Sequence, residues 1–189
     1  MRRGVSAFLL LSNRRRARQL AASLSRSKPT LLEEELDTTS RIVVATGAAT
    51  ERLAQIYGDP QQLLEIDRRR FEEVIAEIFH GFGYIVELTA QTRDGGRDIV
   101  ALGTMDQIRT KYLIECKRPD PGNPVGVSFV RQLLGVVEDE RATKGLLVAT
   151  TRFTPDARAL EQKNQWRLEL KEFEQIMQWI SLYLQLKSK

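Results

Sequence analysis

Cysteine and histidine are almost absent from this 189-residue sequence. Cys116 is the one cysteine and His80 the one histidine, which excludes an intramolecular disulfide and leaves no zinc site of thiolates and imidazoles. Long hydrophobic runs are also lacking, because the apolar run at residues 5–11 is far shorter than the roughly 20 residues that span a bilayer. We therefore expect no membrane partner and a reducing compartment, the cytoplasm.

The isoelectric point of 9.4 suggests a nucleic-acid partner, but the positive charge is unevenly distributed. Residues 1–30 hold eight Arg and Lys and no acids, and residues 31–70 hold five basic and eight acidic residues. Residues 71–189 hold 16 basic and 17 acidic residues and are close to neutral. Because the excess of basic residues belongs to the start of the chain, a DNA-binding role has to be argued from a site.

The patterns divide the chain into three parts. Residues 1–30 are rich in Arg and Ser, which is typical of a basic and disordered tail, an organellar transit peptide or an extension upstream of the true start. Residues 31–66 are helical in pieces, with a break at residues 58–60, and either cap the main domain or pack in a homodimer. Residues 67–189 carry the strongest patterns and form the main domain.

Alternating helical and strand patterns fill the main domain. Its first helix begins at Asp67, a good N-cap, carries apolar residues at i, i+3, i+4, i+7 and i+8, and ends near Gly83. The other expected elements are strands at residues 84–88, 98–102, 112–117, 145–150 and 166–170, and helices at residues 127–139, from 154 onward, and 172–186.

This order of elements predicts an α/β protein. A three-strand meander followed by crossover helices argues for a mixed central sheet with helices on both faces. The nearly continuous apolar run at residues 145–150 predicts a buried, central, parallel strand. No glycine-rich phosphate loop or internal repeat is present in residues 67–189. Trp166 and Trp179 are expected in the core rather than on a base-stacking surface.

Polar residues gather at one end of two adjacent expected strands. Alternation places Glu115 and Lys117 on one face of their strand and Cys116 on the other. Asp98 begins the neighbouring strand directly after the glycine turn at residues 95–96. Charged groups at the end of an apolar strand cost free energy unless they pair or bind something. The alternatives are a structural ion pair and a site for a metal and a phosphate.

Two carboxylates and a lysine suit the hydrolysis of a phosphodiester. Mg²⁺ is typically held by one or two carboxylates together with waters and a substrate phosphate, and Mn²⁺ can substitute for it. Asp98 and Glu115 are the candidate metal ligands. Lys117 is placed to lower the pKa of an attacking water or to neutralise developing charge. Cys116 is excluded, because it points to the opposite face and thiolates suit softer metals.

Beyond the bare pattern, three longer segments carry a resemblance to a known family. These segments are FEEVIAEIFHGFGYIVELTAQTRDGGRDIVA, YLIECKR and GLLVATTRFTPDA. In this order they resemble the catalytic domain of Mrr-like restriction endonucleases, within the PD-(D/E)xK nuclease superfamily. The resemblance covers residues 67–180. Arg97 stands where the superfamily pattern often has proline, and Glu115 stands where several Mrr-like members have glutamine.

The resemblance implies a restriction-endonuclease-like fold and Mg²⁺-dependent cleavage of DNA. It implies that Asp98 and Glu115 are metal ligands, that Lys117 is the catalytic lysine and that Glu72 is a fourth catalytic residue. Helix geometry favours Glu72 independently, because it lies at the edge of the apolar stripe whereas Glu73 points away into solvent. Gln132 is a candidate accessory residue, with a solvated surface glutamine as the alternative.

Two other functions fit the same residues. One is a non-catalytic module that binds DNA or takes part in assembly while keeping the nuclease fold. The other is a junction-resolving or repair nuclease, which differs in the shape of its substrate. For cutting both strands with one site per chain, a homodimer or two successive encounters are required. Three arginines, Arg118, Arg131 and Arg152, either contact phosphates or lie on an ordinary surface.

Overall fold

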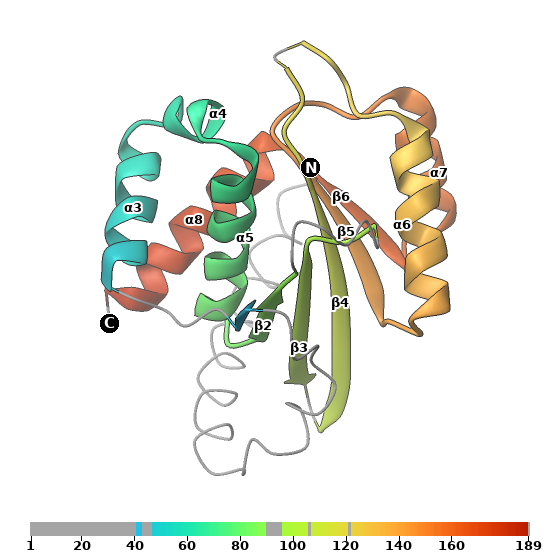
Figure 1. Ribbon diagram of the computed structural model, residues 1–189, viewed down its shortest axis with the longest axis horizontal. Coiled ribbons are helices and arrows are strands. Elements are labelled where there is room, and N and C mark those ends of the chain that lie inside the picture. Colours follow the sequence, from blue (N-terminus) through green and yellow to red (C-terminus); the bar gives the residue numbers. More distant parts are fainter. Residues whose placement is uncertain (1–40, 43–46, 90–95, 106, 121, 189) are drawn as a thin grey trace, which may run out of the picture.

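The computed structural model describes residues 41–42, 47–89, 96–105, 107–120 and 122–188. The predicted tail at residues 1–30, residues 31–40 of the next segment and Gly95 of the glycine turn lie outside the described residues. The elements carry the labels of Figure 1 and run in the order β1 (Arg41–Ile42), α3 (Gly47–Gly58), α4 (Gln62–Glu65), α5 (Arg68–Gly81), β2 (Ile85–Leu88), β3 (Ile99–Met105), β4 (Ile108–Lys117), α6 (Val127–Asp139), β5 (Lys144–Ala149), α7 (Pro155–Lys163), β6 (Leu168–Lys171) and α8 (Phe173–Lys187).

Within the described residues, six strands form one mixed sheet in the order β1-β2-β3-β4-β5-β6. The pairs from β1 to β4 are antiparallel, whereas β5 runs parallel to both β4 and β6. The sheet confirms the predicted α/β architecture. It also confirms that the apolar run at residues 145–150 is a buried parallel strand with a neighbour on each side.

Helices cover both faces of the sheet, as predicted (Figure 1). On one face α3, α5 and α8 form a hydrophobic core with alternate strand residues such as Ile114 and Val148. On the other face α6 and α7 pack against the intervening residues, such as Leu113 and Leu147. None of the described helices combines the length and the apolar character needed to span a bilayer.

Local sequence signals set the position of α5, which contributes to the candidate site. The Asp67 side chain accepts a hydrogen bond from the backbone N–H of Arg70 at 2.9 Å and so caps the helix. The predicted apolar residues are buried, from Phe71, with no exposed surface, to Phe79. Gly83 follows the helix with φ of +94°, a left-handed conformation that favours glycine.

Residues 47–65 pack on the main domain rather than standing apart. Leu53 and Ile56 of α3 and Leu63 of α4 lie in the core formed with α5 and α8. Arg41 and Ile42, which lie between the predicted helical pieces, form a strand that the sequence did not predict. They pair with β2, since an open sheet edge offers unpaired backbone groups that an extended segment can satisfy.

The expectation that Trp166 lies in the core was also wrong. Its side chain is 81% exposed, because the strand alternation begins at Leu168 and leaves Trp166 in the turn that follows α7. Trp179 agrees better with the prediction, since it is partly buried against the core and packs edge-on to Phe79.

The outer edge of β6 is covered by side chains of α7. Glu161 accepts a hydrogen bond from the backbone N–H of Leu170 at 2.7 Å, and Arg158 donates to the Leu170 carbonyl at 3.2 Å. Arg158 also pairs with Glu172 at 2.6 Å. Both outward-facing backbone groups of Leu170 are thus satisfied within the chain.

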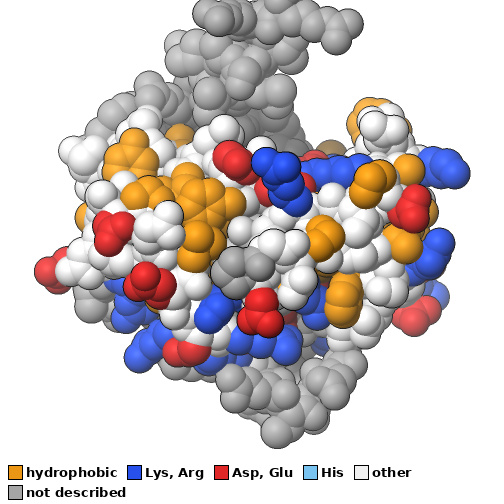
Figure 2. All heavy atoms as spheres, turned by 90° about the horizontal axis from the view of Figure 1, so that it is seen from above, with side chains coloured by type: hydrophobic (Ala, Val, Ile, Leu, Met, Phe, Trp, Pro, Cys, Tyr) orange, Lys and Arg blue, Asp and Glu red, His pale blue; other side chains and the backbone are white. Residues whose placement is uncertain are grey.

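The surface carries no large field of one charge on the face seen in Figure 2, where acidic and basic side chains are interspersed. This agrees with the near-neutral composition of residues 71–189.

Candidate active site

The backbone before β3 fixes the position of Asp98. Gly96 has φ of +69°, and a Cβ atom there would lie 3.0 Å from a methyl group of Val136. The turn therefore requires glycine both for its conformation and for the close approach of α6. Asp98 then joins the sheet, because its N–H donates to the Ile114 carbonyl and its own carbonyl accepts from the Thr89 N–H, both at 2.9 Å.

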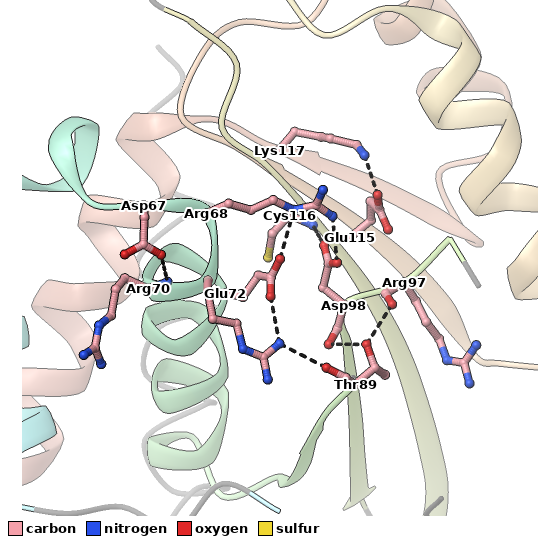
Figure 3. Close-up of polar contacts among 11 residues, drawn as sticks. Asp67, Arg68, Arg70, Glu72, Thr89, Arg97, Asp98, Glu115, Cys116 and Lys117 are labelled. Atoms are coloured by element: carbon pink, nitrogen blue, oxygen red, sulfur yellow. Dashed lines mark hydrogen bonds and ion pairs between the residues drawn. The ribbon is translucent and has the colours of Figure 1, made fainter. Parts of the chain in front are cut away.

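The Asp98 carboxylate is held across the sheet by β4. Its Oδ2 atom accepts a hydrogen bond from the backbone N–H of Cys116 at 2.7 Å. Only 9% of the residue is exposed. This bond leaves Oδ1 as the oxygen that faces the other charged side chains (Figure 3).

Glu115 and Lys117 lie on the same face of β4, as alternation predicted. The Lys117 ammonium is 2.5 Å from Glu115 Oε1. It also lies 4.5 Å from the centre of the Phe129 ring on α6, a cation–π contact. A carboxylate and an aromatic ring together thus hold the lysine at the end of the strand.

Glu72 reaches the sheet from α5, as helix geometry predicted, and only 3% of it is exposed. Each of its oxygens accepts from an arginine at 3.0 Å: Oε1 from Arg68 and Oε2 from Arg69. Glu73 is less solvated than expected, with 19% of its side chain exposed, because it pairs with Arg70 at 2.8 Å and with Arg52 of α3 at 3.9 Å.

Two arginines complete the site, and the sequence reasoning missed both. Arg68 donates through Nε to Glu72 and through Nη2 to Asp98 Oδ1 at 3.2 Å, so it joins two carboxylates from different elements (Figure 3). Arg69 donates to Glu72 and to the Thr89 carbonyl, each at 3.0 Å. The available signal was the spacing of four and three residues between these arginines and Glu72, which places them on one helix face.

The carboxylates interact strongly with one another. Burial raises the pKa of Glu115, and the negative charge of Asp98 raises it further, whereas Lys117 and Arg68 oppose the shift. Burial and the charge of Asp98 likewise raise the pKa of Glu72, against the opposing effect of Arg69 and Arg68. The negative charge of Asp98 thus raises the proton affinity of both Glu115 and Glu72, and a bound cation would oppose this effect.

The Cys116 side chain, unlike its backbone N–H, lies away from this cluster. It has no exposed surface and packs in the core on the opposite face of the sheet. Burial raises the pKa of its thiol well above the ordinary value, and the charge of Asp98 adds to the shift, so the thiol stays protonated.

The other candidates are placed as follows. Gln132 is exposed on α6, and its side-chain nitrogen would lie 3.5 Å from a Cβ atom at Gly96, beside the turn that precedes Asp98; its accessory role stays a prediction. Arg118, Arg131 and Arg152 have no ion-pair partner among the described residues. His80 lies at the end of α5, where the charges of Glu77 and Lys187 act on it.

The oxygen donors of the site are few for a divalent metal. In the part of the chain that the structure describes, no three His, Cys, Asp or Glu side chains are grouped to hold a metal ion. Asp98 and Glu115 remain, and two carboxylates completed by water are sufficient for Mg²⁺. A cationic group, the Arg68 guanidinium, already contacts Asp98 Oδ1, which shows that this oxygen accepts a positively charged partner.

A mixed sheet covered on both faces, with acids and a lysine at the ends of two central strands, defines a restriction-endonuclease-like domain. The solved structure of the DNA modification-dependent restriction endonuclease AspBHI has the same fold, with a TM-score of 0.53 and 19% identity over 77% of this chain and 41% of that one. The family model of the Mrr catalytic domain, described as restriction endonuclease, matches residues 63–180. The chain belongs to this family.

Two curated proteins are similar in sequence. An uncharacterized protein, y4cE, of Sinorhizobium fredii (strain NBRC 101917 / NGR234) is 28% identical over 160 residues, which are 84% of this chain and 41% of that protein. The type IV methyl-directed restriction enzyme EcoKMrr of Escherichia coli (strain K12) is 28% identical over 108 residues, which are 54% of this chain and 34% of that enzyme. This chain therefore spans less than half the length of each relative.

Proposed function

We propose that this chain is the catalytic domain of a DNA endonuclease that hydrolyses phosphodiester bonds with the help of Mg²⁺ or Mn²⁺. The observation that carries the proposal is the convergence of Asp98, Glu115 and Lys117 at the same end of β3 and β4. Glu72 of α5 joins the cluster through Arg68, which bonds both Glu72 and Asp98.

Asp98 and Glu115 would hold the divalent cation. When bound, the cation supplies a Lewis acid that neutralises charge on the phosphoryl oxygens and activates a water. Both residues are at least nine-tenths buried, so their charges act in a medium less polar than water, where they interact with a cation more strongly.

Lys117 is the residue that we assign to the reacting groups. Its contacts with Glu115 and with the Phe129 ring hold the ammonium beside the Glu115 carboxylate. There it lowers the pKa of the attacking water or neutralises charge that develops on the phosphate. Glu72 acts by orienting Arg68 and Arg69, since both of its oxygens already accept from these arginines.

The relatives suggest the class of DNA to test first. EcoKMrr is described as methyl-directed and AspBHI as modification-dependent. This chain covers about a third to two fifths of those proteins, so the choice of target is a separate question from the chemistry. A panel of methylated, unmethylated, branched and single-stranded DNA, with and without Mg²⁺, separates a restriction enzyme from a junction-resolving or repair nuclease.

The mechanism is tested by Asp98→Ala and Lys117→Ala in the purified chain. Each substitution is expected to reduce cleavage by about 10²–10³-fold or more, the range for removing one preorganised electrostatic group. The measurement is the initial rate of plasmid nicking in Mg²⁺, with circular dichroism to show that the fold is kept.

Lys163→Ala is the matched control, because Lys163 is an exposed lysine at the end of α7, far in the chain from the site. It is expected to cleave like the wild type. Cleavage that persists at the wild-type rate in Lys117→Ala would rule out the proposed role of this lysine.

The Arg68 contact is the observation that favours a second candidate, a non-catalytic module that binds DNA. A guanidinium that neutralises Asp98 and Glu72 allows the carboxylates to be buried without a metal. This candidate predicts no heat of Mg²⁺ or Mn²⁺ binding in calorimetry and unchanged DNA affinity in Glu115→Ala. Metal-dependent cleavage would remove it.

A further inference from the structure

Arg68 is the first residue of α5, and its side chain crosses from the helix to the sheet. Its guanidinium donates from Nε to Glu72 at 3.0 Å and from Nη2 to Asp98 at 3.2 Å. Figure 3 shows it between the helix and the strand ends, on the same side as the Glu115 carboxylate. One cation thus serves acids that come from α5 and from the start of β3.

The two oxygens of Asp98 have different partners, and this difference matters. Oδ2 is bonded to the backbone N–H of Cys116 at 2.7 Å, a contact that is fixed by the pairing of β3 with β4. Oδ1 is bonded to Arg68 alone among the described residues. A metal ion that binds through Oδ1 therefore competes with the Arg68 guanidinium. Both would occupy the same oxygen and neutralise the same negative charge.

Arg68 is also the counter-ion that can move. Its side chain is 63% exposed, whereas the side chain of Arg69 is 26% exposed and is anchored on the Thr89 carbonyl as well as on Glu72. An exposed arginine loses little by turning into solvent or toward a phosphate, because both are good partners for a guanidinium. Arg69 can keep Glu72 paired after Arg68 has left.

We propose that Arg68 is an exchangeable counter-ion that competes with the divalent cation for Asp98. This inference rests on the proposed function, because it concerns the same site. In the metal-free protein the guanidinium holds the carboxyl groups of Asp98 and Glu72 in place. Binding of the divalent cation at Asp98 displaces it. Arg68 thereby sets the concentration of cation at which the site is loaded.

The test is calorimetric titration of Mn²⁺ and Mg²⁺ into the full chain without DNA. Arg68→Gln removes the competitor and is expected to tighten cation binding by at least about fivefold, the lower end of common coupling between two ligands. Arg68→Lys keeps a charge but cannot bridge two carboxylates with a planar fork, so its affinity is expected between those of the wild type and Arg68→Gln.

Arg70→Gln is the matched control, since Arg70 has the same helix and the same type of contact but pairs with Glu73, away from the metal ligands. Its cation affinity is expected to equal that of the wild type. A second measurement on the same proteins is thermal unfolding. In EDTA the midpoint should fall in Arg68→Gln, and added Mg²⁺ should raise it more than in the wild type.

A third measurement observes Arg68 in the wild-type protein itself. The Nε–Hε signal of Arg68 in its NMR spectrum, assigned by its loss in the conservative variant Arg68→Lys, is expected to shift on addition of Mg²⁺. An unmoved signal at saturating Mg²⁺, or equal affinity in the wild type and Arg68→Gln, overturns the exchange and leaves the metal site intact. Absence of cation binding in both proteins overturns the proposed metal site as well.

Discussion

The imidazole of His80 is a titratable group with a buried nitrogen, Nδ1, that forms no hydrogen bond with the described residues. Burial lowers the pKa of His80 below its ordinary value of 6.5, and Lys187 adds to the shift while Glu77 opposes it. The unfolded chain then takes up a proton at a higher pH than the folded chain, so protonation favours unfolding.

We expect the stability of the folded state to fall as the pH drops below about 6.5, until the folded histidine is itself protonated. His80→Gln removes this term, so the slope of unfolding midpoint against pH should become shallower between pH 7.5 and 5.5. The check is thermal unfolding by circular dichroism in EDTA, for both proteins, across this range. Identical slopes would refute a role for His80 in the acid sensitivity.

The residues of the site differ in how far the sequence predicted them. Glu115 and Lys117 were predicted to share a face because side chains alternate along a strand, and Asp98 was proposed because it begins the neighbouring strand after the glycine turn. Glu72 was implied by the resemblance to Mrr-like nucleases, and helix geometry independently favoured it over Glu73. Arg68 and Arg69 were missed, since a run of arginines at the start of a helix is ordinarily a solvated surface. Only the fold brings Asp98 within reach of Arg68.

At the scale of elements, a polar contact in the core links three helices. The Tyr183 hydroxyl of α8 donates to the buried Glu77 of α5 at 2.9 Å and lies 3.0 Å from the Thr50 hydroxyl of α3. A buried carboxylate that loses its partner pays the full cost of desolvation. Tyr183→Phe is therefore expected to lower the free energy of unfolding by about 1–3 kcal/mol, measured by urea denaturation.

Tyr57→Phe provides the control, because it deletes the same hydroxyl from a tyrosine that is 50% exposed on α3. Its expected effect is within about 0.5 kcal/mol of zero, as for most surface substitutions. Equal losses in the two variants would contradict the linkage through Glu77.

The order of the helices and strands in residues 67–189 was predictable, because periodicity of 3.6 or 2 persists wherever one side of an element is buried. The extent of the β3–β4 hairpin was not. Both strands extend beyond the predicted ends, β3 to Met105 and β4 back to Ile108, through mostly polar or small residues that leave no apolar pattern in the sequence. The packing of α3 against α8 could not be predicted from the sequence either, because Thr50 and Tyr183 are 133 residues apart in the chain.

For the whole molecule, the number of sites limits how DNA would be cut under the proposed function. A chain with one cluster of Asp98, Glu115 and Lys117 would hydrolyse one phosphodiester at a time. We expect supercoiled plasmid to pass through the nicked form before the linear form appears, with more nicked DNA at low protein concentration. The measurement is a time course on agarose gels at several concentrations, alongside sedimentation to detect a homodimer. Linear DNA that forms without a nicked intermediate at every concentration would contradict it.

The side chains of α7 that cover β6 bear on how copies of this chain can meet. An open sheet edge invites another strand to add to it, which is a common route to dimers and to fibres. Here Glu161 and Arg158 already bind the outward N–H and carbonyl of Leu170. An added strand would first have to break these two charge-assisted hydrogen bonds. A sheet that runs from one copy into the next across β6 is thereby disfavoured. Two copies that met at this edge, for example to cut opposite DNA strands, would have to contact each other through helices or loops.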